Sequence, residues 1–311
     1  MRPVFHWNLG ARTLELGKRT LIMGVVNVTP DSFSDGGLYF DRDRAVERAL
    51  QLLQQGADIL DIGGESTRPG SSVMVKDKGG AEERPRPERG TAASKTCTVV
   101  SEREELDRVL PVIVAVKHAK ADALISVDTY KAGVAHAAVE AGATIVNDVS
   151  GFRWDPQMIK TLAELKCGTI LMHMRGRPEE WRQLKPVADP VVLVKRELSD
   201  WTQDVVRLGI KRDRIVLDPG LGFGKSFEQN YPLLKRLDEL HSLRFPLLIG
   251  ASRKSFVGRA LSKDGHDAPT GERLHGTLAA ETVAILKGAH IIRTHDVKAS
   301  VDAARMADVL S

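Results

Sequence analysis

The sequence predicts an α/β protein of a single domain, a closed (βα)8 barrel. Short β-rich apolar runs alternate with amphipathic helical patterns from residue 20 to the end of the 311-residue chain. The apolar runs hold mostly Val, Ile and Leu without strict polar alternation, which is typical of strands covered on both faces. Short joints between strand and helix favour a parallel sheet, and eight such units leave nothing for a second domain. A doubly wound open sheet is the structural alternative.

The predicted elements follow one another in strict alternation. Strands are expected at residues 20–27, 58–63, 123–128, 144–148, 169–173, 214–218, 246–250 and 290–295. Helices are expected at residues 44–55, 102–117, 131–141, 157–166, 191–208, 231–240, 272–287 and 298–310. Because glycine adopts the left-handed conformation that closes a helix, the glycines behind five helices predict C-terminal caps. They are Gly56, Gly142, Gly168, Gly209 and Gly288.

One segment interrupts the alternation. Residues 71–100 are rich in charged residues, Pro and Gly and poor in apolar ones. Such a segment cannot bury enough surface to offset the entropy of ordering it, so we expect a long flexible insertion in the loop after the second strand. A basic arm that binds a partner is a second hypothesis, although acidic and basic residues nearly balance there.

Composition excludes several classes of function. The hydrophobic fraction of 42% and charged fraction of 28% are those of an ordinary globular protein. The formal net charge is only +4, with basic and acidic residues interleaved, so no basic track for nucleic acid is expected. Neither a signal peptide nor a membrane-spanning run is present, and Cys97 and Cys167 form neither a disulfide framework nor a metal-binding pattern. We therefore expect a cytoplasmic protein that binds neither nucleic acid nor membrane.

Polar side chains stand at the ends of the expected strands, where barrels of this kind carry their chemistry. One such residue would more often be a turn or a helix cap, but eight at corresponding positions predict a ligand site. These strand ends carry Asn27, the run at 61–67, Asp128, Asn147 with Asp148, His173, Asp218, Ser252 with Arg253 and Lys254, and Arg293 with His295.

The residue types at the strand ends suggest the ligand. Asp128, Asn147 and Asp218 suit a flat heterocycle that carries N–H donors. Lys254, Arg293 and His295 offer donors and positive charge, which suit a phosphate or diphosphate.

Two features invite other interpretations. The Gly-rich residues 220–225 lack the spacing of a dinucleotide fingerprint and predict only a flexible loop. A Schiff-base role is conceivable for Lys254, since barrel aldolases place a lysine at a strand end. Nothing in the sequence predicts an apolar, pKa-lowering setting for Lys254, because Arg253 lies beside it.

Seven segments, in order across nearly the whole chain, resemble the dihydropteroate synthase family. They are residues 23–37 (MGVVNVTPDSFSDGG), 61–70 (DIGGESTRPG), 126–131 (SVDTYK), 146–151 (VNDVSG), 218–225 (DPGLGFGK), 252–255 (SRKS) and 293–297 (RTHDV). The resemblance implies a TIM barrel that joins a dihydropterin methyl diphosphate to 4-aminobenzoate. The products would be dihydropteroate, on the way to folate, and diphosphate.

The resemblance also implies roles for residues at matching positions. The pterin diphosphate would be bound by Thr67, Asp128, Asn147, Asp218, Lys254, Arg293 and His295, and Asp128, Lys254, Arg293 and His295 would be catalytic. 4-Aminobenzoate would be bound by Phe33, Thr67, Arg68, Pro69, Phe223, Lys254 and Ser255. Asn27 would contact Mg²⁺, which diphosphate oxygens and water would otherwise hold. A homodimer is implied as well.

Two other functions remain open. A methyltetrahydrofolate-dependent methyltransferase has a related pterin-binding barrel, but it has no use for residues 67–69 or 252–255 as aminobenzoate and diphosphate sites. A non-catalytic pterin-binding protein would lack either the anion site or the arylamine loops, and this sequence has both. The chain departs from the family in the length of residues 71–100, which directly follow Gly70.

Overall fold

A closed barrel of eight parallel strands forms the centre of the molecule. The computed structural model describes residues 2–28, 38–66, 73, 75–76, 82–83 and 99–311, with the backbone alone for 38–41, 75–76 and 82–83. The sheet has the order β10-β9-β8-β7-β4-β3-β12-β11, and a parallel bridge between Leu217 and Leu247 joins its two edges. The strands are β3 (Leu21–Asn27), β4 (Ile59–Gly63), β7 (Leu124–Asp128), β8 (Ile145–Asp148), β9 (Gly168–Met172), β10 (Ile215–Asp218), β11 (Leu248–Ile249) and β12 (Ile291–Thr294). The predicted barrel is confirmed, and the open-sheet alternative is excluded.

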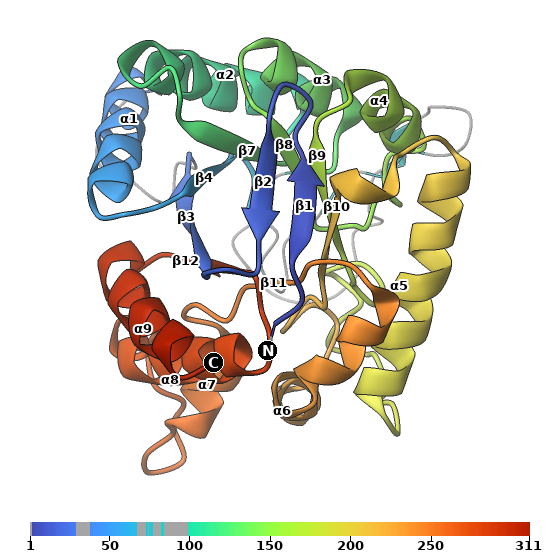
Figure 1. Ribbon diagram of the computed structural model, residues 1–311, viewed down its shortest axis with the longest axis vertical. Helices are drawn as coiled ribbons and strands as arrows, with labels where there is room; N and C mark the ends of the chain where they lie inside the picture. The colour runs from blue at the N-terminus through green and yellow to red at the C-terminus, as the bar shows by residue number, and fades with distance from the viewer. Residues whose placement is uncertain (1, 29–37, 67–72, 74, 77–81, 84–98) are drawn as a thin grey trace, which may run out of the picture.

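Helices surround the barrel (Figure 1). They are α1 (Leu38–Gln54), α2 (Glu102–Ala119), α3 (Ala132–Glu140), α4 (Met158–Leu165), α5 (Pro190–Arg207), α6 (Phe227–Lys235), α7 (Ser255–Ala260), α8 (Leu274–Leu286) and α9 (Val297–Val309). Short 3-10 helices span Arg212–Arg214, Leu237–Leu243 and Thr270–Glu272. The sequence predicts all of the α-helices except α7, and the helix predicted at 231–240 divides into α6 and the following 3-10 turn.

Four of the five predicted glycine caps are confirmed. Gly56, Gly142, Gly209 and Gly288 have φ between 94° and 113°. The prediction for Gly168 is wrong, because Lys166 takes the left-handed conformation (φ 54°) and Gly168 begins β9. A Cβ atom on Gly168 would lie 2.3 Å from the Leu9 side chain, so this glycine is required by close packing.

The N-terminal residues form a hairpin that the sequence analysis did not predict. Strands β1 (Phe5–Asn8) and β2 (Thr13–Leu16) pair antiparallel, and Figure 1 shows the hairpin lying across the barrel. Trp7 is buried, and its indole N–H donates to the Arg214 carbonyl at 2.9 Å. Trp7, Leu9 and Leu16 pack in one cluster with apolar residues of the barrel strands, so the hairpin closes the end where the strands begin.

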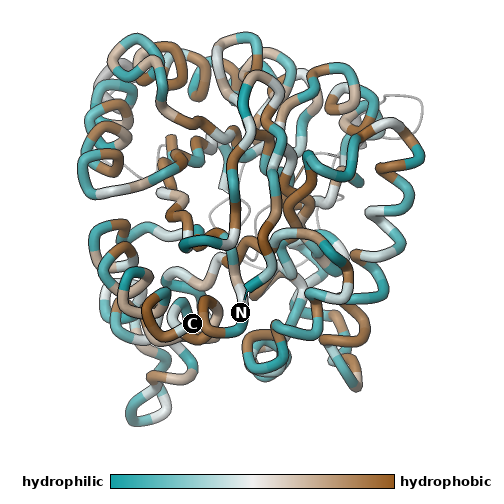
Figure 2. Tube along the Cα trace, in the orientation of Figure 1, coloured by the Kyte–Doolittle hydropathy of each residue, from teal (hydrophilic) through white to brown (hydrophobic). Residues whose placement is uncertain are grey.

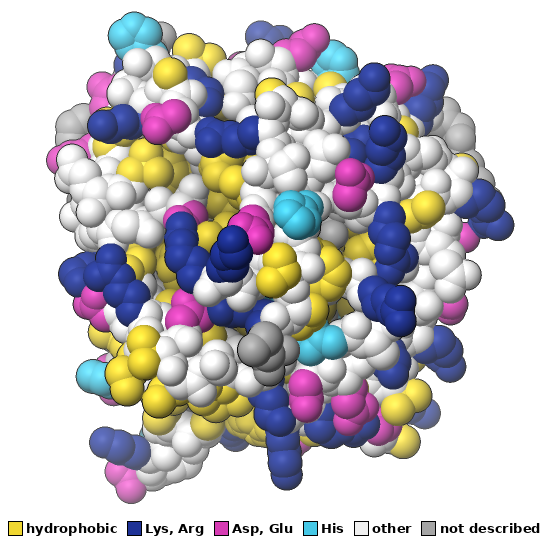
Figure 3. Space-filling view, in the orientation of Figure 1, with side chains coloured by type: hydrophobic (Ala, Val, Ile, Leu, Met, Phe, Trp, Pro, Cys, Tyr) yellow, Lys and Arg dark blue, Asp and Glu magenta, His cyan; other side chains and the backbone are white. Residues whose placement is uncertain are grey.

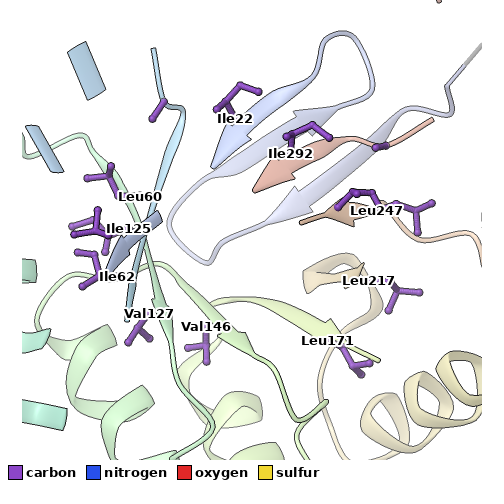
Figure 4. Close-up of a cluster of buried hydrophobic side chains, with 14 of the residues drawn as sticks. Ile22, Leu60, Ile62, Ile125, Val127, Val146, Leu171, Leu217, Leu247 and Ile292 are labelled. Carbon is purple, nitrogen blue, oxygen red and sulfur yellow. The ribbon is translucent and has the colours of Figure 1, made fainter. Parts of the chain in front are cut away.

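The strands contribute to two separate apolar layers. Ile22, Leu60, Ile125, Leu171 and Ile292 belong to an outer layer that packs against the helices (Figure 4). The alternate residues belong to the inner cluster under the hairpin, namely Leu21, Met23, Ile59, Leu124, Ile145, Ile170, Val216, Leu248 and Ile291. In Figure 2 the strands of the barrel are predominantly hydrophobic, and the helices that surround them have mixed hydropathy.

Polarity changes along the inside of the barrel. Two residues after an inner apolar side chain, a strand residue points to the same side of the sheet. On β4, β8, β10 and β12 the step leads from Ile59 to Asp61, from Ile145 to Asn147, from Val216 to Asp218 and from Ile291 to Arg293. The barrel interior is therefore apolar where the strands begin and polar where they end.

The insertion after β4 is only partly described. Val73 is 1% exposed and packs in a cluster with Tyr130 and Trp154, so the predicted boundary at residue 71 is too early. Strands β5 (Val75–Lys76) and β6 (Glu82–Glu83) pair antiparallel. The remaining residues from 74 to 98 lie outside the described part, and their flexibility stays a prediction.

Charges are mixed on the face that the hairpin covers. Figure 3 shows Lys and Arg spread over this face with Asp and Glu between them.

In the described part of the chain, no helix is long and apolar enough to cross a membrane.

Candidate active site

A partly buried ionic network occupies the polar end of the barrel. Arg293 on β12 donates through Nε to Asp61 on β4 and through a terminal nitrogen to Asp128 on β7, both at 2.6 Å. The Asn147 side-chain amide on β8 donates to the same Asp61 oxygen at 3.1 Å. Four strands thus bring two carboxylates, an amide and a guanidinium together.

Burial sets the charge states in this network. It raises the pKa of Asp128 to about 7, although Arg293 opposes the shift. Burial also lowers the pKa of Arg293, but Asp61 and Asp128 outweigh that effect and the net shift is upward. Arg293 is therefore a fixed cation, whereas Asp128 changes its charge near neutral pH.

Lys254 and Asp218 form the neighbouring part of the site. Burial lowers the pKa of Lys254 to about 8, while Asp218 favours the ammonium form. Burial raises the pKa of Asp218, with Lys254 opposing. The sequence offered no sign of this pKa-lowering setting, which comes from burial of Lys254. Its neighbour Arg253 pairs with Asp296 through two hydrogen bonds.

The Gly-rich residues 220–225 make close backbone contacts with the loop after β9, and their flexibility stays a prediction. Gly220, Gly222 and Gly224 all have positive φ, between 64° and 84°. A Cβ atom on Gly220 would lie 1.9 Å from the His173 carbonyl oxygen, so the loop after β10 presses against the loop after β9. Only glycine permits this approach.

His295 and Asn27 lie on a second side of the site. The His295 ring nitrogen Nδ1 lies 3.0 Å from the Ser252 hydroxyl, which also accepts from the His295 backbone N–H at 3.1 Å. Asn27, Arg253 and His295 line one wide groove of about 1550 Å³, together with residues of α1 and α2. The two strand ends therefore open onto a common space.

The aminobenzoate residues are only partly described. Phe223 is half-buried with its ring edge-to-face against Trp181 at 5.3 Å, and Lys254 Nζ lies 4.3 Å from the centre of the Phe223 ring. Ser255 is exposed at the start of α7. Phe33, Thr67, Arg68 and Pro69 lie outside the described residues.

Two strand-end residues face away from this network. His173 hydrogen-bonds Glu197 of α5 at 2.9 Å and stacks on Trp201, and burial lowers its pKa to about 4. Asp148 accepts from the Ser150 backbone N–H at 2.6 Å and closes its own turn. Both stand among the strand-end residues from which the sequence predicts a ligand site, but neither belongs to this network.

Asp61 is the site residue that received no role from the sequence. It is completely buried, yet it binds both Arg293 and Asn147. The available signal was a carboxylate between Leu60 and Ile62 inside an apolar strand, since a buried charge needs a partner.

Fold and network define an enzyme barrel that presents acceptors and cations side by side at the ends of its strands. Such a site fits a flat, nitrogen-rich ligand that carries an anionic group. The pterin binding enzyme family model matches residues 23–82 and 90–295, and the chain belongs to this family.

The relatives are similar over nearly their whole length. The dihydropteroate synthase of Clostridium beijerinckii is 39% identical over 97% of this chain and 98% of its own. The solved structure of Xanthomonas albilineans dihydropteroate synthase with 4-aminobenzoic acid has a TM-score of 0.83 at 37% identity, over 99% of this chain and 98% of that one. A structure of the same enzyme with 7,8-dihydropteroate has a TM-score of 0.79 at 35% identity, and covers 98% of both chains.

Proposed function

We propose that this protein is a dihydropteroate synthase, which joins a dihydropterin methyl diphosphate to 4-aminobenzoate. The observation that carries this proposal is Arg293 between Asp61 and Asp128, with Lys254 and Asp218 beside them. Carboxylates and an amide suit the N–H donors of a pterin, while the cations suit its diphosphate. The relatives' bound 4-aminobenzoic acid and 7,8-dihydropteroate support the proposed nucleophile and the proposed product.

The residues would act chiefly through electrostatics. The bond between the exocyclic carbon of the pterin and the diphosphate oxygen breaks, and a bond from that carbon to the arylamine nitrogen forms with loss of a proton. Arg293, His295 and Lys254 would stabilise the negative charge that builds on the departing diphosphate. Asp128 would favour positive charge on the pterin. Since the neutral arylamine is the nucleophile, no strong base is needed.

Substrate binding would exchange the partners of this network. Asp128, Asn147 and Asp218 would accept from or donate to the pterin ring, while Thr67 with Arg293 and His295 would contact the diphosphate. Asp61, completely buried, would keep Arg293 in place after Asp128 turns to the pterin. Phe33, Thr67, Arg68, Pro69, Phe223, Lys254 and Ser255 would bind 4-aminobenzoate.

Asn27 fits the proposed contact with Mg²⁺. Its amide oxygen is a hard donor at the end of β3, in the groove that it shares with His295. Mg²⁺ keeps several waters and often binds through few protein ligands together with substrate phosphates. When bound, the ion would neutralise charge on the diphosphate. Within the described residues, no group of three or more His, Cys, Asp or Glu gathers as a metal site.

A homodimer is proposed through the outer faces of α6 and α8. Tyr231, Val283 and Leu286 are between 37% and 48% exposed there. Tyr231 and Val283 line a groove of about 500 Å³ whose rim mixes acidic and basic residues, as a self-complementary two-fold contact requires. Val283→Glu with Leu286→Glu should give monomers in analytical ultracentrifugation. Val309→Glu on α9, where Val309 is 81% exposed, is the matched control.

We place the protein in the cytoplasm, where its substrates would be small molecules and neither nucleic acid nor membrane would be a partner. Cys167 is a buried free thiol, which suits a reducing compartment.

One assay tests the proposed activity. Purified protein with Mg²⁺, pterin diphosphate and labelled 4-aminobenzoate should form labelled dihydropteroate, and Arg293→Met should form at least about 100-fold less. Methyl transfer from methyltetrahydrofolate without dihydropteroate formation would favour the methyltransferase instead. Pterin binding without turnover would favour the non-catalytic alternative.

A further inference from the structure

Lys225 is a buried ammonium that the proposed chemistry does not use. Its side chain belongs to the Gly-rich segment after β10, and the residue is 8% exposed. Nζ donates to three backbone carbonyls, those of Gly220 at 2.8 Å, Phe223 at 3.1 Å and His173 at 3.3 Å. Burial lowers the pKa of Lys225, and the charged groups that face it are Asp218, Lys254, Arg175 and Glu197.

The three carbonyls belong to two different loops. Gly220 and Phe223 lie in the loop after β10, whereas His173 follows β9. The same loops touch again at Gly224, where a Cβ atom would lie 2.2 Å from the Arg175 carbonyl oxygen. A lysine has three ammonium hydrogens, so Lys225 can satisfy all three carbonyls at this junction.

The loop that Lys225 holds supplies contacts of Lys254. The Lys254 ammonium donates to the Leu221 carbonyl and lies over the Phe223 ring, 4.3 Å from its centre. Leu221 and Phe223 both lie between Gly220 and Lys225 in the chain. A displacement of this loop would therefore move one support of Lys254 and one wall of the proposed aminobenzoate pocket together.

We propose that Lys225 is a positioning residue, whose three carbonyl contacts fix the loop that orients Lys254 and Phe223 for 4-aminobenzoate. Lys225 itself touches neither substrate. Lys254 belongs to both proposed subsites, but Phe223 belongs to the aminobenzoate pocket alone. On the pterin side, Arg293, Asp61, Asp128 and Asn147 lie on other strands and hold one another directly. Loss of the three contacts thus affects the aminobenzoate side of the site more than the pterin side.

Two variants of Lys225 test this proposal, which rests on the proposed function. Lys225→Met keeps the length but has no donors, and Lys225→Gln restores up to two donors without charge. Lys298→Met, on the exposed face of α9, is the matched control. Both KM values and the pH dependence of kcat/KM are measured for each protein.

For Lys225→Met we expect KM for 4-aminobenzoate to rise about tenfold while KM for pterin diphosphate stays within about twofold. The alkaline limb of kcat/KM should move up by roughly half a pH unit, because a looser loop admits water to Lys254. Lys225→Gln should show an aminobenzoate KM about threefold above wild type, since it makes part of the contacts.

Equal changes in both KM values, or an unchanged aminobenzoate KM, would overturn the positioning role. If Lys225→Met does not fold, Lys225→Gln with an aminobenzoate KM equal to wild type overturns it. If the wild-type protein forms dihydropteroate and the Lys225 variants have unchanged KM values, the positioning role fails while the proposed function stands. A wild-type protein that forms no dihydropteroate contradicts the function itself.

Discussion

At the scale of single residues, Arg293 connects the two halves of the proposed site. Its guanidinium holds Asp61 and Asp128, so one of its two partners also belongs to the proposed pterin contacts. A ligand with ring N–H donors and a diphosphate would break the bond between Arg293 and Asp128. Asp128 would then accept from the ring N–H groups, and Arg293 would donate to the diphosphate. Because both new partners arrive on one molecule, the site would favour the intact pterin diphosphate over either fragment.

Asp128→Asn should keep the fold and lose at least about 100-fold in kcat, because a fixed carboxylate beside a developing cation is a preorganised electrostatic contact. Steady-state kinetics and circular dichroism measure the two effects. Asp302→Asn removes an exposed carboxylate on α9 and should change neither. Activity within about threefold of wild type, under 1 kcal/mol, would exclude this role for Asp128.

The pH dependence of kcat/KM for pterin diphosphate should be a narrow bell. The proposed role of Asp128, whose pKa burial raises to about 7, requires the carboxylate form, so activity should rise as pH passes upward through 7. The proposed role of Lys254, whose pKa burial lowers to about 8, requires the ammonium form that would stabilise the departing diphosphate. Activity should therefore fall above pH 8. Lys254→Arg should abolish the alkaline limb, because arginine stays charged. An identical limb in that variant would assign it to another group.

At the scale of elements, the sequence predicted the barrel strands because their apolar runs are buried on both faces. Even β11, only Leu248–Ile249 in the structure, lies within its predicted run. The hairpin escaped prediction because β1 and β2 are four residues each, and Trp7 alone among the residues of β1 is buried. Helix α7 escaped because Ser255–Ala260 is too short to show a helical period.

The site was predictable where strand ends carry polar residues, and less so where tertiary pairing decides. Asp128, Asn147, Asp218 and Arg293 follow from their positions after apolar runs. The role of Asp61 depends on Arg293, which is 232 residues away, and the pairing of Arg253 with Asp296 depends on contact between loops. The low pKa of Lys254 follows from burial, which no local pattern shows.

Trp7→Ala should lower the free energy of unfolding by about 3–5 kcal/mol, because it empties a buried site and breaks the bond to Arg214. Differential scanning calorimetry should show Tm lower by about 10 °C. His6→Ala changes an exposed side chain of the same strand and serves as the control. Values of kcat below the Tm should stay within about twofold of wild type, since the hairpin lies at the opposite end of the barrel from Arg293. A large loss of kcat would show that the two ends are coupled.

At the scale of the whole molecule, we expect the insertion after β4 to contribute little to the stability of the barrel. Replacing residues 75–98 by a short Gly/Ser link should lower Tm by less than about 8 °C, or about 2 kcal/mol, because few apolar residues are removed and loop closure depends weakly on length. KM for aminobenzoate should change more than KM for pterin diphosphate, because the link begins five residues after Gly70.

Val73→Ala is the informative comparison for that deletion. Val73 remains in the shortened chain and is 1% exposed, so its truncation should lower Tm more than the deletion does. A larger loss of Tm from the deletion would show that residues 75–98 pack as part of the structure.

The change of polarity along the inside of the barrel also has a meaning for protein engineering. Ile59, Ile145 and Val216 each precede by two positions a side chain of the proposed site. Inside the barrel, an apolar layer that stabilises the fold and a polar layer that carries the proposed chemistry therefore follow one another along the same strands. A library of apolar substitutions confined to the apolar layer and the hairpin that packs on it could be selected for thermal stability alone. A second library, confined to the polar layer, could be selected for binding of new ligands while the apolar layer stays unchanged. The barrel thus offers two design problems that can be solved one after the other.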